Sequence, residues 1–97
     1  MDEVNLLVFV EVMLGKRIEQ FEAYKKLKPL VEAETGYLRY ELLSNLVDEN
    51  KFILVEKWAS QLALDTHDNT DHMIAVDTHN FKFRARSARL QKASIVL

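Results

Sequence analysis

The sequence predicts an α+β fold in which a single domain, residues 1–97, places strands and helices in the order β-α-β-β-α-β. Three observations predict it. Apolar residues recur at every second position near both ends of the chain and twice in its middle, as they do in half-buried strands. An amphipathic segment of helical period follows the first alternating stretch. A short polar turn joins the two central stretches, which makes them an antiparallel hairpin.

The first strand is predicted over residues 4–13, where β-branched and apolar side chains dominate. Both of its faces are largely apolar, so we expect a helix to cover one face and a second subunit to cover the other. Gly15 ends this strand, and a helix is predicted over residues 16–34. Pro29 lies inside that helix. Because proline lacks an amide hydrogen, a kink or a break near Lys25 is expected.

The rest of the chain supplies the other three strands and the second helical region. Strands are predicted over residues 37–44 and 51–58, and Ser60 and Thr70 each stand where they can cap a short helix. The final stretch, residues 89–97, alternates again and is predicted to be the fourth strand. This order is the split βαβ arrangement of ferredoxin-like folds, with a four-stranded antiparallel sheet and helices on one face.

Composition excludes several classes of function. The chain has no cysteine, which excludes disulfides and thiol catalysis, and its net charge of −2 argues against nucleic acid as a partner. The acidic first residues do not resemble a signal peptide, and residues 4–14 are too short to cross a bilayer, so a cytoplasmic protein without membrane contact is expected. Because 48% of so short a chain is hydrophobic, we expect a homodimer that buries the excess apolar surface.

Aromatic side chains gather in the two central strands and indicate a small-molecule pocket. Trp58, the only tryptophan, ends the third strand, and Phe52 and Leu54 share its face. Together they can form an apolar wall that suits an aromatic ligand, although each can equally be a core residue. Tyr40 and Arg39 point to opposite faces of the second strand, so at most one of them serves a given pocket.

Two histidines supply candidate proton acceptors. Histidine has an ordinary pKa of about 6.5, so a neutral imidazole can accept a proton from a bound molecule near neutral pH. His72 is the first candidate, although it can equally help to start a helix or satisfy a backbone carbonyl. His67 is the second, although its position at a helix end already explains it structurally. The spacing of these histidines and of Asp68 and Asp71 matches no standard zinc pattern, and no third convergent ligand is apparent, so no metal is expected.

A run of cations follows the last predicted helix. Its members are Lys82, Arg84, Arg86, Arg89 and Lys92. Such a cluster can attract an acidic substrate or a phosphate group, or it can be a solvated face.

Three segments together resemble the antibiotic biosynthesis monooxygenase family, which includes quinol monooxygenase-like proteins. They are ETGYLRYEL (34–42), VEKW (55–58) and SQLALDTHDNTDH (60–72). The resemblance implies a dimeric α+β barrel, in which two ferredoxin-like subunits pack sheet against sheet and each keeps a pocket between its sheet and its helices.

The same resemblance implies oxidation of a quinol-like or phenolic small molecule without a cofactor, with His72 as the base. The alternatives are an isomerase or haem-degrading activity on the same fold, and a module that binds a small molecule without turnover. In haem-degrading relatives an asparagine early in the first strand lies in the pocket, and Asn5 resembles it in position. Asn5 can also be a solvated residue near the strand end.

Overall fold

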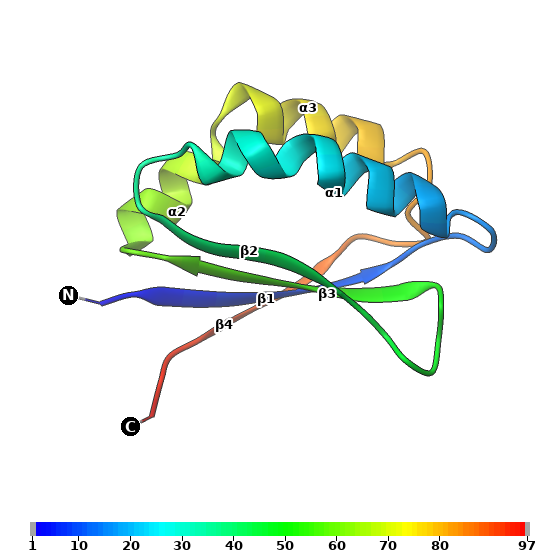
Figure 1. The fold of residues 1–97 in the computed structure, drawn as a ribbon, viewed down its shortest axis with the longest axis horizontal. Coiled ribbons are helices and arrows are strands. Elements are labelled where there is room, and N and C mark those ends of the chain that lie inside the picture. The colour runs from blue at the N-terminus through cyan, green and yellow to red at the C-terminus, as the bar shows by residue number, and fades with distance from the viewer. Residues whose placement is uncertain (1, 97) are drawn as a thin grey trace.

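The computed structural model describes residues 2–96, which form a four-stranded antiparallel sheet in the order β2-β3-β1-β4. The strands are β1 (Val4–Glu11), β2 (Tyr37–Ser44), β3 (Lys51–Trp58) and β4 (Arg89–Ala93). The helices are α1 (Arg17–Glu32), α2 (Gln61–Asp68) and α3 (Asp71–Asn80). They lie on one side of the sheet (Figure 1). The predicted ferredoxin-like arrangement is therefore confirmed.

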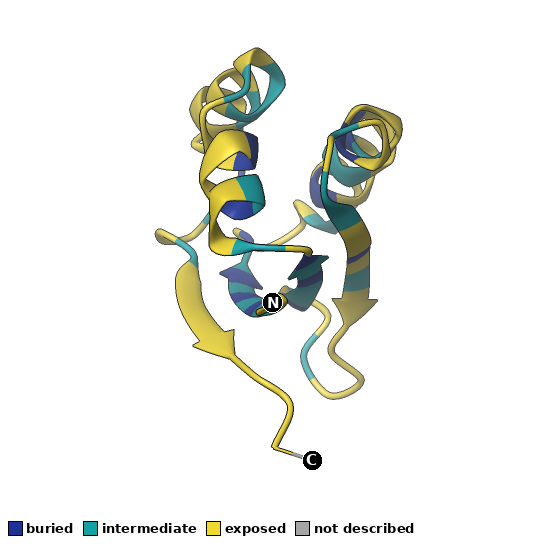
Figure 2. Cartoon of the chain, turned by 90° about the vertical axis from the view of Figure 1, so that its left-hand side faces the viewer, coloured by how far each residue is buried: buried dark blue, intermediate teal, exposed yellow. Residues whose placement is uncertain are grey.

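The two faces of the sheet differ in burial. In β1 the even-numbered side chains from Leu6 to Val10 are buried beneath the helices, and the odd-numbered ones are only partly buried. β3 pairs with the whole of β1, from Val4 opposite Trp58 to Glu11 opposite Lys51, and shows the same alternation. β4 is exposed along its whole length (Figure 2). One face of the sheet thus carries the core, and the other is uncovered in a single copy.

Some element boundaries differ from the predicted ones. β1 ends at Glu11, because Val12 forms only an isolated bridge as the chain turns away. β4 ends at Ala93, short of the predicted residue Leu97, which lies outside the described residues. Residues 78–80 form the last turn of α3.

Helix α1 passes through Pro29 as one continuous helix, so a break near Lys25 is not found. The proline removes one hydrogen bond to the carbonyl of Lys25, but both residues are exposed, and water can satisfy that carbonyl. The helix ends soon afterwards at Glu32.

The connections around α2 hold it against the start of β2. Ser60 Oγ accepts a hydrogen bond from the Ala63 amide at 3.1 Å, and Thr70 Oγ1 accepts one from the Met73 amide at 3.3 Å, so both predicted caps are confirmed. Gly36 has a φ of +83°, and a Cβ there would lie 2.5 Å from the Cβ of Ala63. Glycine therefore permits both the turn and the close approach of α2.

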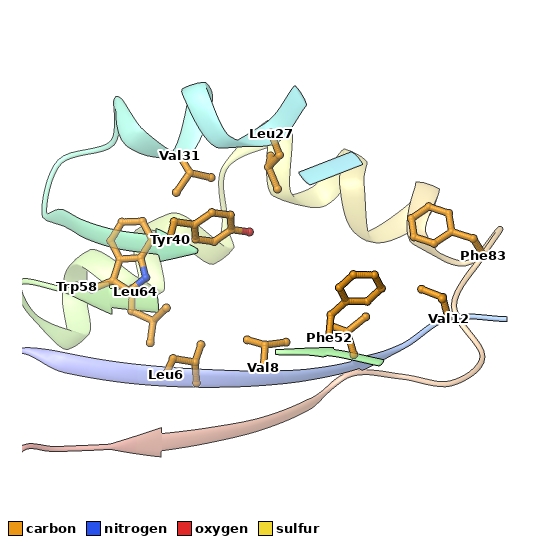
Figure 3. Close-up of a cluster of buried hydrophobic side chains, with 11 residues drawn as sticks. Leu6, Val8, Val12, Leu27, Val31, Tyr40, Phe52, Trp58, Leu64 and Phe83 are labelled. Atoms are coloured by element: carbon orange, nitrogen blue, oxygen red, sulfur yellow. The ribbon is translucent and has the colours of Figure 1, made fainter. Parts of the chain in front are cut away.

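The buried core extends beneath the helices from one end of the sheet to the other. Trp58, Leu64 and Val31 pack at one end, and Val12 and Phe83 pack at the other (Figure 3). Trp58 and Val31 are completely buried. The middle of this layer is where the candidate site lies.

Candidate functional site

A cavity of about 320 Å³ lies between the sheet and the helices, a size within the usual range of small-molecule sites. Much of its wall is apolar and comes from β1, β3, α1 and α3, with Val8, Leu54, Leu27 and Val76 as examples. The polar and charged side chains in the wall are Gln20, Tyr24, Tyr40, Glu56, His67, Asp68, Asp77, Asn80 and Arg84. An apolar hollow with a few convergent polar groups is the usual form of a ligand site.

Glu56 places a buried carboxyl group in this wall. Strand alternation puts it between Leu54 and Trp58 on the helix-covered face, where it is only 4% exposed. Its Oε1 accepts a hydrogen bond from Trp58 Nε1 at 2.9 Å, and within residues 2–96 its Oε2 has no hydrogen-bond partner. Burial raises the pKa of Glu56 above its ordinary value, although the Trp58 hydrogen bond and the nearby His67 oppose this. A carboxylate in such surroundings is a stronger base than an exposed one.

His67 lies directly behind this carboxyl group. Its imidazole is buried, and its Nδ1 lies 3.0 Å from both carboxylate oxygens of Glu34. Its Nε2 lies 3.7 Å from Glu56 Oε1 and has no hydrogen-bond partner in the described part of the chain. The ring of Trp58 packs against the imidazole with 4.4 Å between centroids. Glu34 and Trp58 thus fix the ring so that Nε2 is directed toward Glu56.

His72 does not line the cavity. Its Nε2 lies 2.7 Å from Glu34 Oε2, on the carboxylate that also holds His67. The imidazole borders a different hollow, an outer groove of about 430 Å³ between α1 and α3 that also includes His79. The two predicted proton acceptors are therefore joined through Glu34, but only His67 borders the cavity.

Glu34, His67 and His72 together have the donor atoms of a metal site. Their ligand atoms all lie within 4.8 Å of one another. The sequence indicated no third ligand near the two histidines, and the fold supplies Glu34. Two imidazoles and a carboxylate suit a divalent transition metal. In the structure each imidazole lies at hydrogen-bond distance from the Glu34 carboxylate, 3.0 Å for His67 and 2.7 Å for His72.

The predicted wall residues fall into two groups. Tyr40 and Leu54 line the cavity, and burial raises the pKa of Tyr40, which keeps its hydroxyl protonated. Trp58 and Phe52 share the helix-covered face but do not border the cavity. Trp58 packs behind it, and Phe52 lies beneath the guanidinium of Arg17, 5.2 Å from ring centroid to Cζ.

Asn5 does not reach the cavity. The alternation of β1 turns its side chain to the uncovered face of the sheet, where it is paired with Lys57 of β3 and Ala93 of β4. Its neighbours on that face are Leu7 and Phe9, as predicted, but the pocket lies on the other side.

Sequence reasoning missed Glu56, the most informative residue of the cavity wall, although the sequence contains a signal for it. An acidic residue between Leu54 and Trp58 on one face of a predicted strand must either be solvated or have a function. Glu34 and Arg84 carry no comparable local signal. Glu34 precedes the β2–β3 hairpin in the sequence, and His67, which it contacts, follows that hairpin. Arg84 likewise contacts Gln20, which lies far from it in the sequence.

Comparisons with known proteins identify the family of the chain. The profile of the family described as "Antibiotic biosynthesis monooxygenase" matches residues 4–77. The chain belongs to this family. A curated relative is YcnE of Bacillus subtilis, which its name describes as a candidate monooxygenase. It is 31% identical over 69 residues, which cover 71% of this chain and 73% of YcnE.

Solved structures share the fold at low sequence identity. A Pseudomonas aeruginosa protein superposes with a TM-score of 0.91 at 21% identity, covering 100% of this chain and 97% of its own. A Caulobacter crescentus protein, titled as an antibiotic biosynthesis monooxygenase, superposes with a TM-score of 0.92 at 23% identity, covering 99% and 92%. Within residues 2–96, each helix is too short or too polar to span a membrane.

Proposed function

We propose that this family member is a monooxygenase that oxidises a quinol-like or phenolic small molecule in the cavity, using no metal or organic cofactor. The observation that carries the proposal is Glu56, a buried carboxyl group with a raised pKa in the wall of an apolar cavity. Membership of the family supports monooxygenase activity in general terms. The substrate class follows from what the wall can bind and deprotonate.

In the first step, Glu56 Oε2 takes the hydroxyl proton of the bound phenol. His67 is a positioning residue: Glu34 holds its Nδ1, and its Nε2 faces Glu56. His72 acts one contact further away, by fixing Glu34. The hydroxyl of Tyr40, which is turned toward the middle of the core, stays protonated and can donate a hydrogen bond to the phenolate oxygen (Figure 3).

The later steps need no external reductant, because a phenol gives up four electrons in becoming a quinone, and the reduction of O2 takes four. The phenolate transfers one electron to oxygen, and the two radicals combine at a hydrogen-bearing ring carbon next to or opposite the hydroxyl. The peroxide then takes the proton from Glu56 and becomes a hydroperoxide. Loss of water from it leaves a quinone. One oxygen atom enters the product, and the other leaves in water with the phenolic hydrogen and the hydrogen of that ring carbon.

Isotopically labelled oxygen tests the reaction class. We expect a panel of phenols and hydroquinones to include a substrate whose quinone product carries one labelled oxygen, with the other label recovered in water. Ligand-induced thermal stabilisation without oxygen uptake would instead indicate a binding module. A Soret band on mixing with haem, or conversion without oxygen, would favour the haem-degrading or isomerase alternatives.

We also infer that two copies of the chain pack through the uncovered face of the sheet. The centre of that face is apolar, with Leu7 and Phe9 of β1 opposite Val55 and Ile53 of β3. Lys57, paired with Asn5, supplies part of a polar border. An apolar centre with a polar rim is the anatomy of a subunit interface, and this face lies opposite the cavity, so each copy keeps its own site.

A further inference from the structure

Arg84 lies where the cavity reaches the surface. It follows α3 and lines both the cavity and an adjoining surface hollow of about 500 Å³. Three other residues, Asp77, Asn80 and Ala88, also belong to both walls. A ligand that enters the cavity from this hollow therefore passes the Arg84 guanidinium.

Most of the hydrogen-bonding capacity of Arg84 is unused. Its Nε donates to Oε1 of the buried Gln20 at 2.8 Å, which fixes the side chain. Within residues 2–96 its two terminal nitrogens donate no hydrogen bond, and no carboxylate lies within 4.0 Å of the guanidinium. Partial burial lowers the pKa of Arg84, while Tyr40 and Asp77 oppose this at longer range. A half-buried cation with four unused N–H donors is costly unless a ligand pairs with it.

The other cations of the predicted basic run are not available to the cavity. Arg86 lines the surface hollow but not the cavity, and it pairs with Glu11 at 3.3 Å. Arg89 stacks over Phe9 on the uncovered face, 4.0 Å from the ring centroid. Lys82 is exposed and borders neither hollow. Lys92 donates to Gln61 Oε1 at 2.9 Å, so Arg84 is the member of that run that lines the cavity itself.

We propose that Arg84 binds a carboxylate of the ligand through its two terminal nitrogens, so that the natural ligand is an aromatic carboxylic acid whose ring lies in the cavity. The planar fork of arginine matches a carboxylate in a bidentate pair. Asn80 supports the same subsite, since its Oδ1 is buried at the shared wall without a hydrogen-bond partner in the described residues and can accept from a neighbouring ligand hydroxyl. The inference refines the substrate of the proposed oxygenase and rests on that proposal only for the reaction.

Calorimetry with naphthoate and its neutral analogue naphthamide tests the subsite, because neither compound is a phenol and binding is read without turnover. We expect the wild-type protein to bind naphthoate about ten- to a hundredfold more tightly than naphthamide, the usual contribution of hydrogen bonds between charged partners. Arg84→Gln should lose that preference and keep its affinity for naphthamide. Lys82→Gln removes a positive charge from an exposed position outside both hollows, and it should keep the preference for naphthoate.

A second variant controls for a folding defect in Arg84→Gln caused by the loss of the Gln20 contact. Arg84→Lys keeps the charge but not the fork, and should retain only part of the preference. Equal affinity of the wild-type protein for the two compounds, binding of neither, or the same loss in Lys82→Gln would overturn the carboxylate subsite. Arg84-dependent binding without oxygen uptake on any phenol would overturn the proposed oxygenase alone, and oxygen uptake without a carboxylate preference would overturn this inference alone.

Discussion

The two faces of the sheet are built from the same alternating strands but present opposite kinds of surface. Under the helices, Leu6 and Val8 are buried beside a cavity that nevertheless contains Glu56 and His67. On the other face, apolar side chains such as Val55 remain partly exposed, with no helix over them. A polar group placed where water is scarce indicates chemistry, whereas apolar groups placed where water is plentiful indicate a partner.

The largest effect is expected on the uncovered face. Val55→Asp places an uncompensated charge at the centre of the proposed interface, and we expect it to weaken self-association by about a thousandfold. Sedimentation equilibrium measures this directly. Leu46→Asp, in the fully exposed turn between β2 and β3, is the control and should leave association unchanged. A wild-type protein that is monomeric at micromolar concentration would contradict the dimer outright.

On the covered face, a core truncation should cost stability rather than assembly. Leu64→Ala removes a side chain that is 2% exposed, and we expect it to lower the free energy of unfolding by about 3 kcal/mol in urea denaturation. Leu62 lies on the same helix but is 74% exposed, so Leu62→Ala should change it by less than about 0.5 kcal/mol. Similar losses in the two variants would mean that α2 does not pack as described.

A smaller effect is expected at the start of α2, which carries His67. Ser60→Ala removes the cap on the Ala63 amide and should cost about 1 kcal/mol of unfolding free energy. Thr78→Ala, on an exposed residue whose hydroxyl contacts only the Ile74 carbonyl in the described chain, serves as the comparison and should cost less. Equal costs would show that the cap contributes nothing specific.

The smallest effect is a change in the pH dependence of stability. Because the folded-state pKa of Glu56 is raised above its ordinary value of 4.5, the native protein holds this proton more tightly than the unfolded chain does. The stabilisation that this proton gives the native state is present below pH 4.5, and it is lost as the pH rises through the folded-state pKa of Glu56. Glu56→Gln should remove that decline from the curve of unfolding free energy against pH. A decline of the same size in the variant would show that Glu56 is not responsible.

The fold could be predicted from the sequence because its signals are local. Alternation in β1 and β3, the caps at Ser60 and Thr70, and the short hairpin turn each act within a few residues. Pro29 misled this reasoning, since a proline near an exposed helix end costs less than one in a buried helix centre.

The site was only partly predictable, because its contacts join distant segments. Tyr40, Leu54 and His67 lie in the cavity wall, whereas Asn5, which was proposed from resemblance to relatives, lies on the opposite face of the sheet. The contacts that orient the site, such as Arg84 with Gln20, join α1 to the chain after α3. No periodicity in the sequence reports such a contact.

The central claim is that Glu56 removes a proton from the substrate on the covered face. Steady-state oxygen uptake with an accepted phenol or hydroquinone tests it most directly, with Glu56→Gln measured beside Glu41→Gln, which alters an exposed carboxylate of β2. We expect kcat to fall by about a hundredfold or more in Glu56→Gln, as when a general base is removed, and to stay near the wild-type value in Glu41→Gln. A Glu56→Gln variant with wild-type kcat would contradict the account.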